Sequence, residues 1–145
     1  MKNKIFNLIL FLSCTIGFAQ QTVTWEDLSK VEFTDKYFPI YEEYFMYPEF
    51  SDTVKALDGK QVTITGYFLN ISPEDDLYIL SKGPMSACFF CGQGGPETAV
   101  EVHFETQQDF KTDTVVAITG TLALNQNDVE HFIYILSDCK GKLVN

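Results

Sequence analysis

Cysteine residues carry the most reactive chemistry in this sequence, and two of them share one short motif. A Cys-x-x-Cys-Gly motif occupies residues 88–92. In this spacing two thiolates reach one metal ion across a tight turn, and the glycine relieves the backbone after it. Zinc needs four ligands at tetrahedral angles. The sequence therefore predicts a metal site at Cys88, Cys91, Cys139 and His131, holding zinc or copper(I), the ions that soft thiolates select.

Two other interpretations of these cysteines stay open. In an oxidising compartment, either Cys88 or Cys91 could form a disulfide with Cys139, which would leave one thiol unpaired. Alternatively, the motif could support thiol–disulfide catalysis. Redox pairs of this kind sit at helix N-termini, which lower the pKa of the thiol. Here Gly-Gln-Gly-Gly-Pro follows the pair. That run is not a helix start, which argues against redox work.

The two histidines offer a weaker pattern. Glu101, His103 and Glu105 share one face of a predicted strand, which is expected to be a solvated acidic face and could alternatively hold a cation. His103 is also the alternative to His131 as the fourth zinc ligand. No Ser-His-Asp pattern or zinc-protease motif is present, and the glycines of residues 92–95 precede a strand, unlike those of a dinucleotide-binding loop. The sequence favours a non-catalytic protein.

Five strands are expected to position these residues. Alternating, β-branched runs predict strands at residues 62–71, 77–80, 99–104, 115–124 and 132–136. No helix pattern separates them, and residues 82–98 form the longest irregular stretch. Such an arrangement is typical of a closed or half-closed β-barrel.

An internal similarity makes the expected barrel more specific. Val-Thr-Ile-Thr-Gly-Tyr-Phe at residues 62–68 resembles Val-Ala-Ile-Thr-Gly-Thr-Leu at residues 116–122. A glycine within a strand marks a bulge or a sharp bend. The first and fourth strands of the oligonucleotide/oligosaccharide-binding (OB) barrel are long, bent neighbours. The predicted fold is therefore all-β, a small five-stranded OB-like barrel. Its third and fifth strands would run parallel, which brings the cysteine loop near His131 and leaves Cys139 at the far end.

The composition of the chain before the barrel indicates two segments. Residues 1–19 show a short basic region, an apolar run and small residues before a cleavage site after Ala19, as in a secretory signal peptide. Acylation of Cys14 as in a lipoprotein is the alternative. Residues 20–58 form an aromatic-rich extension with a short helix expected at 51–57, capped by Ser51. We expect its aromatic side chains to pack on the barrel domain, residues 59–145, rather than to stack on a ligand.

Charge restricts the partners. The chain has a net charge of −10 and no arginine, and loss of the two lysines of the signal would change −10 to −12. Phosphate-binding surfaces need clustered Lys and Arg, so nucleic acid is excluded as an expected partner. No later stretch is apolar enough to span a membrane. A metal ion or a protein partner fits better, and the chain is expected to be exported to the periplasm or beyond the cell.

Parts of the barrel also resemble a family of small exported bacterial domains of unknown function, found in lipoproteins and periplasmic proteins. The similar segments, spread between Gly59 and Cys139, are Gly-Lys-Gln-Val-Thr-Ile-Thr-Gly at 59–66, Ala-Cys at 87–88 and Ile-Thr-Gly-Thr-Leu at 118–122. The chain has Phe90 where that family tends to have histidine, and a Gly-rich run where it has prolines. The resemblance implies an OB-like barrel with an Ala-Cys loop and an association with metal transport.

Overall fold

A computed structural model describes residues 21–72 and 77–144 of the chain. The expected signal peptide and Cys14 lie outside these residues. None of the described helices is long and apolar enough to cross a membrane.

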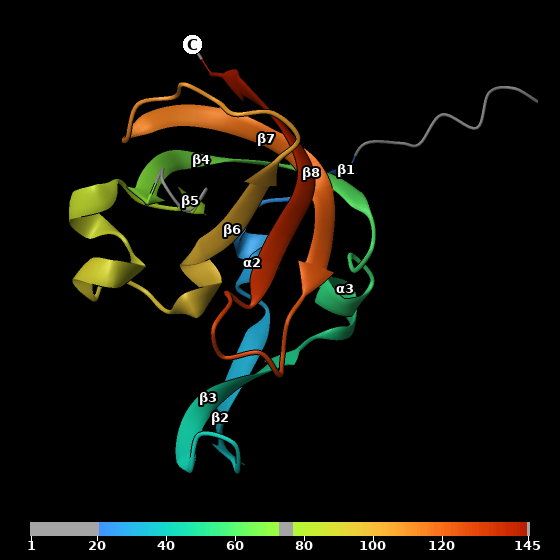
Figure 1. The fold of residues 1–145 in the computed structure, drawn as a ribbon. Helices are drawn as coiled ribbons and strands as arrows, with labels where there is room; N and C mark the ends of the chain where they lie inside the picture. The colour runs from blue at the N-terminus through green and yellow to red at the C-terminus, as the bar shows by residue number, and fades with distance from the viewer. Residues whose placement is uncertain (1–20, 73–76, 145) are drawn as a thin grey trace, which may run out of the picture.

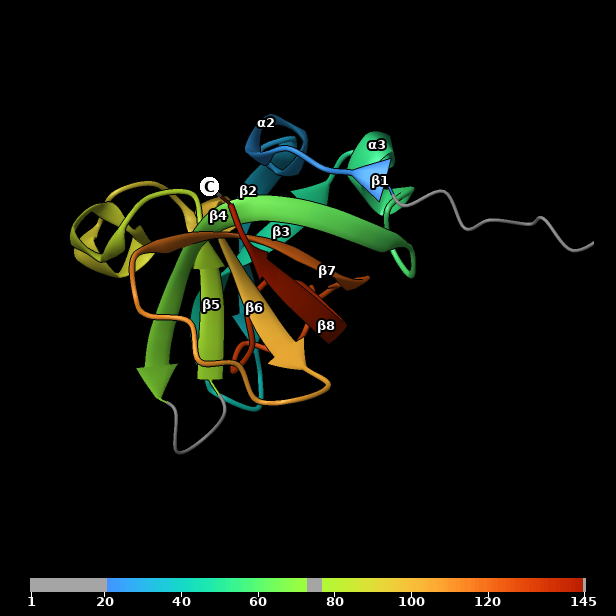
Figure 2. The same ribbon diagram turned by 90° about the horizontal axis from the view of Figure 1, so that it is seen from above.

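A closed barrel of five strands forms the body of the protein (Figures 1 and 2). Its strands are β4 (Gln61–Ser72), β5 (Leu77–Ser81), β6 (Ala99–Phe104), β7 (Thr114–Leu124) and β8 (Tyr134–Leu143). They follow the order β4-β5-β6-β8-β7, and β7 pairs with β4 to close the barrel. Only β6 and β8 run parallel among these neighbours. The predicted all-β, five-stranded OB-like fold is confirmed.

The two similar segments of the sequence are neighbouring strands, as predicted. β4 and β7 pair antiparallel, with Ile64 opposite Ile118. A Cβ atom at Gly66 would lie 2.6 Å from the Ser81 carbonyl oxygen, and one at Gly120 would lie 2.6 Å from the Cys139 sulfur. Both glycines are therefore places where another strand or its side chains come too close for a larger residue.

The last strand differs from its prediction. It was expected at residues 132–136, but β8 begins at Tyr134 and continues to Leu143, paired with β7 along nearly its whole length. Its second half contains polar residues and a positive φ of 54° at Asp138, next to a shift in the pairing. These features hide the strand pattern, and the pairing with the long neighbour β7 overrides them.

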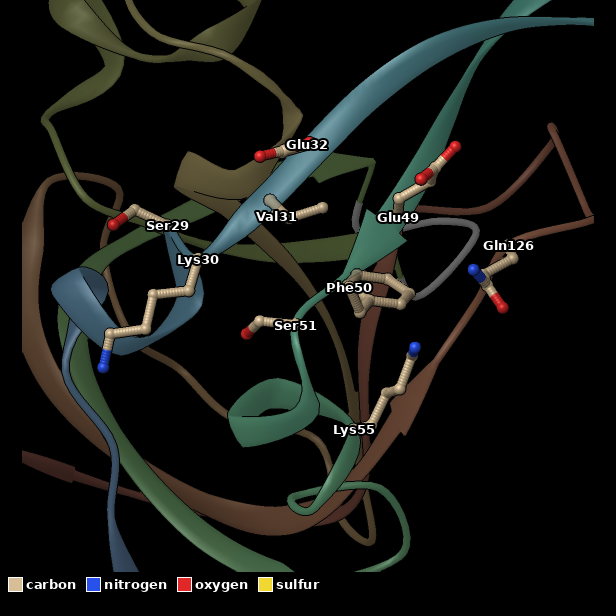
Figure 3. A pocket seen from close by; sticks show the side chains of 9 residues that line it. All are labelled: Ser29, Lys30, Val31, Glu32, Glu49, Phe50, Ser51, Lys55 and Gln126. Carbon is tan, nitrogen blue, oxygen red and sulfur yellow. The ribbon is translucent and has the colours of Figure 1, made fainter.

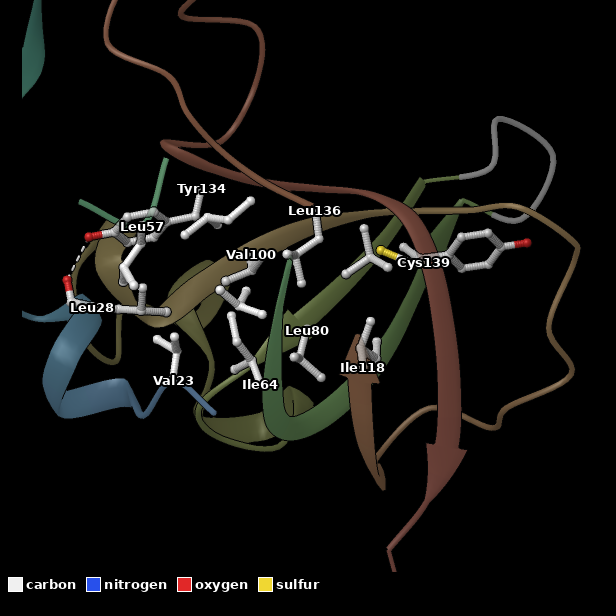
Figure 4. Packing of buried hydrophobic residues seen from close by; sticks show 14 of the residues in the cluster. Val23, Leu28, Leu57, Ile64, Leu80, Val100, Ile118, Tyr134, Leu136 and Cys139 are labelled. Carbon is white, nitrogen blue, oxygen red and sulfur yellow. Dashed lines mark hydrogen bonds between the residues drawn. The ribbon is translucent and has the colours of Figure 1, made fainter. Parts of the chain in front are cut away.

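Two short elements fix the N-terminal extension on the barrel. β1 (Gln21–Thr22) pairs with β4, and α2 (Trp25–Leu28) follows it. The Trp25 indole donates a 2.8 Å hydrogen bond to the Thr65 carbonyl beside Gly66. The buried Tyr134 hydroxyl donates a 2.6 Å hydrogen bond to the Leu28 carbonyl, which Figure 4 shows at the left edge of the packed core. The extension thus contributes to the main core of the protein.

The expected short helix is present as α3 (Asp52–Lys55), and the Ser51 hydroxyl caps it by accepting from the Val54 N–H. Before it lies a hairpin that the sequence reasoning missed, formed by β2 (Val31–Phe38) and β3 (Glu43–Phe50). The hairpin is a separate two-stranded sheet and projects beyond the barrel (Figure 1). Its strands pair despite Pro48, because proline is tolerated where the N–H would face outward from a sheet edge.

The aromatic side chains of the extension pack on the barrel only in part. Phe50 is buried against Tyr134. In contrast, Tyr37, Tyr41 and Tyr44 on the hairpin are exposed to between 41% and 67%. The expectation that these aromatics serve the core is therefore wrong for the outer half of the hairpin.

Candidate functional site

The Cys-x-x-Cys loop folds into a compact turn that brings both thiols to one carbonyl group. It consists of short 3-10 turns at Met85–Ala87 and Phe89–Cys91. Gly92 has a φ of 75°, the left-handed conformation that glycine adopts without strain. The sulfur atoms of Cys88 and Cys91 each donate to the Met85 carbonyl oxygen at 3.1 Å. Two soft donors therefore lie side by side, with Cys88 buried and Cys91 exposed.

An aromatic triad fixes this loop against the start of β8. The Phe132 ring lies 6.4 Å from the Phe89 ring and 5.8 Å from the Phe90 ring, and the latter two are 5.7 Å apart. Such distances fit edge-to-face aromatic contacts. The loop before the third barrel strand therefore lies beside the segment that contains His131, as the parallel pairing of β6 and β8 requires.

The predicted four-ligand metal site is not assembled. Cys139 points into the barrel core beside Gly120, where burial raises its pKa to about 12 (Figure 4). The His131 ring is turned toward Glu101 instead of the thiols. Among residues 21–72 and 77–144, no group of three or more His, Cys, Asp or Glu side chains is arranged to hold a metal ion. Cys88 and Cys91 thus remain as a pair.

The acidity of the exposed thiol bears on the redox interpretation. Within the described chain Cys88, Cys91 and Cys139 are all free thiols. Partial loss of hydration raises the pKa of the exposed Cys91 thiol, and its hydrogen bond with Cys88 acts in the same direction. Since a nucleophilic cysteine needs a lowered pKa, neither feature favours catalysis of thiol exchange.

A second cluster is centred on a buried carboxylate that the sequence reasoning placed on a solvated face. Glu101 is only 2% exposed. One of its oxygens, Oε1, is hydrogen-bonded to His103 Nε2 and to His131 Nδ1, both at 2.8 Å. The other oxygen accepts the Phe132 N–H at 3.1 Å. Glu101 therefore ties the loop before β8 to β6.

This contact changes the acidity of one histidine. The hydrogen bond with Glu101 and the charge of that carboxylate raise the pKa of His131, and the charges of Asp128 and Glu130 act in the same direction. Period-two spacing had placed Glu101 and His103 on one strand face, but it gave no sign that His131 would cover them. That contact depends on the pairing of β6 with β8, which is not visible in the local pattern.

An apolar groove of about 350 Å³ lies between the hairpin, the cysteine loop and the segment that joins β7 to β8. The hairpin contributes Phe38, Phe45, Met46 and Pro48, and the cysteine loop contributes Phe89. Most of residues 125–133 form the opposite wall, which includes Asp128, Glu130 and His131. An apolar groove with a few polar groups at its border is the usual form of a binding site.

A second hollow, of about 570 Å³, lies at the base of the hairpin (Figure 3). Glu32, Glu49 and Lys55 line it, together with Phe50 and Val31. Lys30 also borders it, but the Lys30 ammonium group pairs with Asp27 at 3.0 Å. Its wall is mixed in charge and has none of the aromatic clustering of the groove.

The fold is similar to that of a known structure. The sequence matches no protein family and no curated protein. The crystal structure of a DUF3299 family protein from Pseudomonas aeruginosa superimposes with a TM-score of 0.56 and 18% sequence identity, over 88% of this chain and 97% of that one. At this identity the similarity extends to the fold alone. It agrees with the expectation of an uncharacterised class of small domains.

Proposed function

We propose that this protein is an exported, non-catalytic binding module that holds one soft metal ion between the thiols of Cys88 and Cys91. The observation that supports this is the meeting of both sulfur atoms at the Met85 carbonyl, 3.1 Å from each. The Ala-Cys loop of the resembling domain family lies at this same place in the sequence. A binding role also agrees with the absence of a recognisable catalytic motif from the chain.

Copper(I) suits this pair better than zinc. Zinc takes four ligands in structural sites, and the described residues bring no third His, Cys, Asp or Glu to the thiols. Copper(I) is a soft ion that is selected by cysteine thiolates and is stable with two of them. On binding, one Cu⁺ replaces the protons of both thiols, which gives a dithiolate complex and two released protons.

Competition with bicinchoninate for copper(I) under anaerobic conditions tests the proposal. We expect one copper(I) per protein, lost in Cys88→Ser and in Cys91→Ser. Cys139→Ser is the matched control, because that thiol is buried in the core, and its copper stoichiometry should not change. Equal copper binding by the double variant C88S/C91S, or tight zinc binding instead, would refute the proposal.

A Cys88–Cys91 disulfide is the second candidate, favoured by the same closeness of the sulfur atoms. It would make the loop a structural element of an interaction domain. Intact mass of the protein, isolated without reductant and alkylated, separates the two. A mass two hydrogens lower with one alkylatable thiol indicates the disulfide, whereas a metal ion in the native mass and three alkylatable thiols after its removal indicate the metal site.

A further inference from the structure

We propose that the outer edge of β3 binds an extended, basic peptide segment of a partner protein, which adds a strand to the hairpin and places an apolar side chain in the groove. The groove does not use the Cys88 or Cys91 thiols. Failure of the copper experiment would therefore leave this proposal untouched, and the reverse also holds.

The groove includes the outer edge of β3 as well as part of one face of the hairpin. Phe45 and Met46 are neighbours in β3, so their side chains point to opposite faces of the hairpin. Both nevertheless line the groove. Phe38 of β2 shares a face with Phe45 and lines the groove too, so the space covers part of that face and continues around the edge that β3 does not share with β2. A two-stranded sheet has such a free edge on each strand.

Proline fixes which backbone groups face this edge. Pro48 lies opposite Phe33 and has no N–H to donate to β2. We therefore take this pair as one of the non-hydrogen-bonded pairs of the ladder, in which the backbone groups point away from the partner strand. In agreement, the Pro48 carbonyl accepts a 2.7 Å hydrogen bond from the Gln126 side chain. By the alternation of the ladder, Met46 and Tyr44 present their N–H and C=O groups to the same side. An added strand could pair with them, as in peptide recognition by strand addition.

The opposite wall of the groove is held in shape before any partner binds. The Asn125 amide donates to the carbonyl oxygens of Asp128, His131 and Phe132 at 2.7–3.3 Å. Its own carbonyl oxygen accepts the N–H groups of Asn127 and Asp128. Glu101 holds Phe132 from the other side. A wall that is already ordered lowers the entropy cost of binding.

Charge selects a basic partner. Asp128 and Glu130 line the groove, and within residues 21–72 and 77–144 no hydrogen bond or ion pair joins the Glu130 carboxylate to another side chain. Among the ion pairs of the described residues none joins the nearby Lys36 to either carboxylate, and its ammonium group lies 3.9 Å from the Tyr47 ring centroid and 3.4 Å from the Asn127 side-chain oxygen. Since each copy carries a charge of −10, a second copy of the chain is a poor occupant.

The probe for this site is fluorescently labelled acetyl-Lys-Val-Phe-Val-Lys-amide, with anisotropy as the measurement at low and physiological ionic strength. We expect it to bind more tightly than the same peptide with Glu in place of Lys. A peptide N-methylated at alternate amides, which removes the donors of an added strand, should not bind. Amide resonances of β3 should shift in NMR spectra on addition of the first peptide.

The matched protein variants change the same number of charges at different places. Asp128→Asn with Glu130→Gln should weaken the basic peptide about fivefold, which corresponds to about 1 kcal/mol for two border charges. Glu26→Gln with Asp109→Asn removes two charges outside the groove and should leave the affinity within about twofold. Equal binding of the N-methylated or acidic peptide, or equal loss in both variants, would overturn the proposal. So would pairing of β3 with a second copy, seen as concentration-dependent dimers.

Discussion

Aromatic residues are buried in the barrel with its docked extension, but they are exposed on the outer half of the β2–β3 hairpin. In the barrel, Tyr134 is completely buried and its hydroxyl bonds to Leu28. On the hairpin, Tyr44 is 67% exposed and its ring contacts that of Tyr37. An aromatic residue thus stabilises the fold where strands close around it. Where only two strands pair, it remains exposed.

If this contrast is correct, close packing in the barrel should give the largest effect of a single substitution. Gly120→Ala places a Cβ atom 2.6 Å from the Cys139 sulfur and 2.7 Å from the Ser137 carbonyl, neither of which can move freely. We expect a loss of about 3 kcal/mol in the free energy of unfolding, measured by urea denaturation. Gly59→Ala is the control, since its Cβ meets nothing within 4 Å and only its φ of 71° opposes the change. It should cost about 1 kcal/mol. A smaller effect at Gly120 than at Gly59 would contradict the close packing of β7 against β8.

The contact between the extension and the barrel should give the next largest effect. Tyr134→Phe removes the buried hydroxyl and leaves the Leu28 carbonyl without its donor. An unsatisfied buried group costs about 1–3 kcal/mol, so the free energy of unfolding should fall by that amount. Tyr44→Phe removes an exposed hydroxyl and should change it by less than about 0.5 kcal/mol. Equal effects of the two changes would show that the extension is not held by this bond.

The same contrast explains which parts of the structure were predictable from the sequence. Barrel strands such as β4 alternate cleanly over residues 61–68, because one face meets the core and the other is exposed or half-buried. The glycines at 66 and 120 revealed a pair of neighbouring strands. In β2, a run such as Glu32 to Lys36 has no buried face to alternate against, so it carries no strand pattern.

Only the part of the candidate site that is formed by residues close in the sequence could be predicted. Cys88, Cys91 and Gly92 form the compact turn that their spacing indicated. The Glu101–His131 contact joins residues 30 apart through the β6–β8 pairing, and the groove forms only where the hairpin meets residues 125–133. Neither has a local signature. Cys139 entered the predicted metal site by its residue type alone, although its strand turns it into the core.

The contribution of the loop between β7 and β8 to stability should depend on pH. Because Glu101 raises the pKa of His131 above its unfolded value of about 6.5, protonated His131 favours the folded state. This stabilisation is complete below about pH 6.5 and is lost as the pH rises through the higher folded-state value. His131→Gln should therefore lower the melting temperature more at about pH 6 than at about pH 9. Differential scanning fluorimetry across this range measures the difference. A decrease that is constant, or that grows with pH, would show that the His131–Glu101 contact involves no charge.

The smallest effect on stability is expected at the hairpin, where the comparison is most sharply tested. Tyr44→Thr removes the ring that lies 5.2 Å from Tyr37 across the strand pair but keeps a residue suited to strands. Since both rings are largely exposed, the free energy of unfolding should fall by about 0.5 kcal/mol or less. Hydrogen exchange should show the β2 and β3 amides opening with lower free energies than those of β4 and β7, because two strands without a core open locally. If Tyr44→Thr instead destabilised the whole protein by as much as Tyr134→Phe, the hairpin would be part of the folding unit. Its exposed aromatics would then be needed for the fold and would no longer point to a partner.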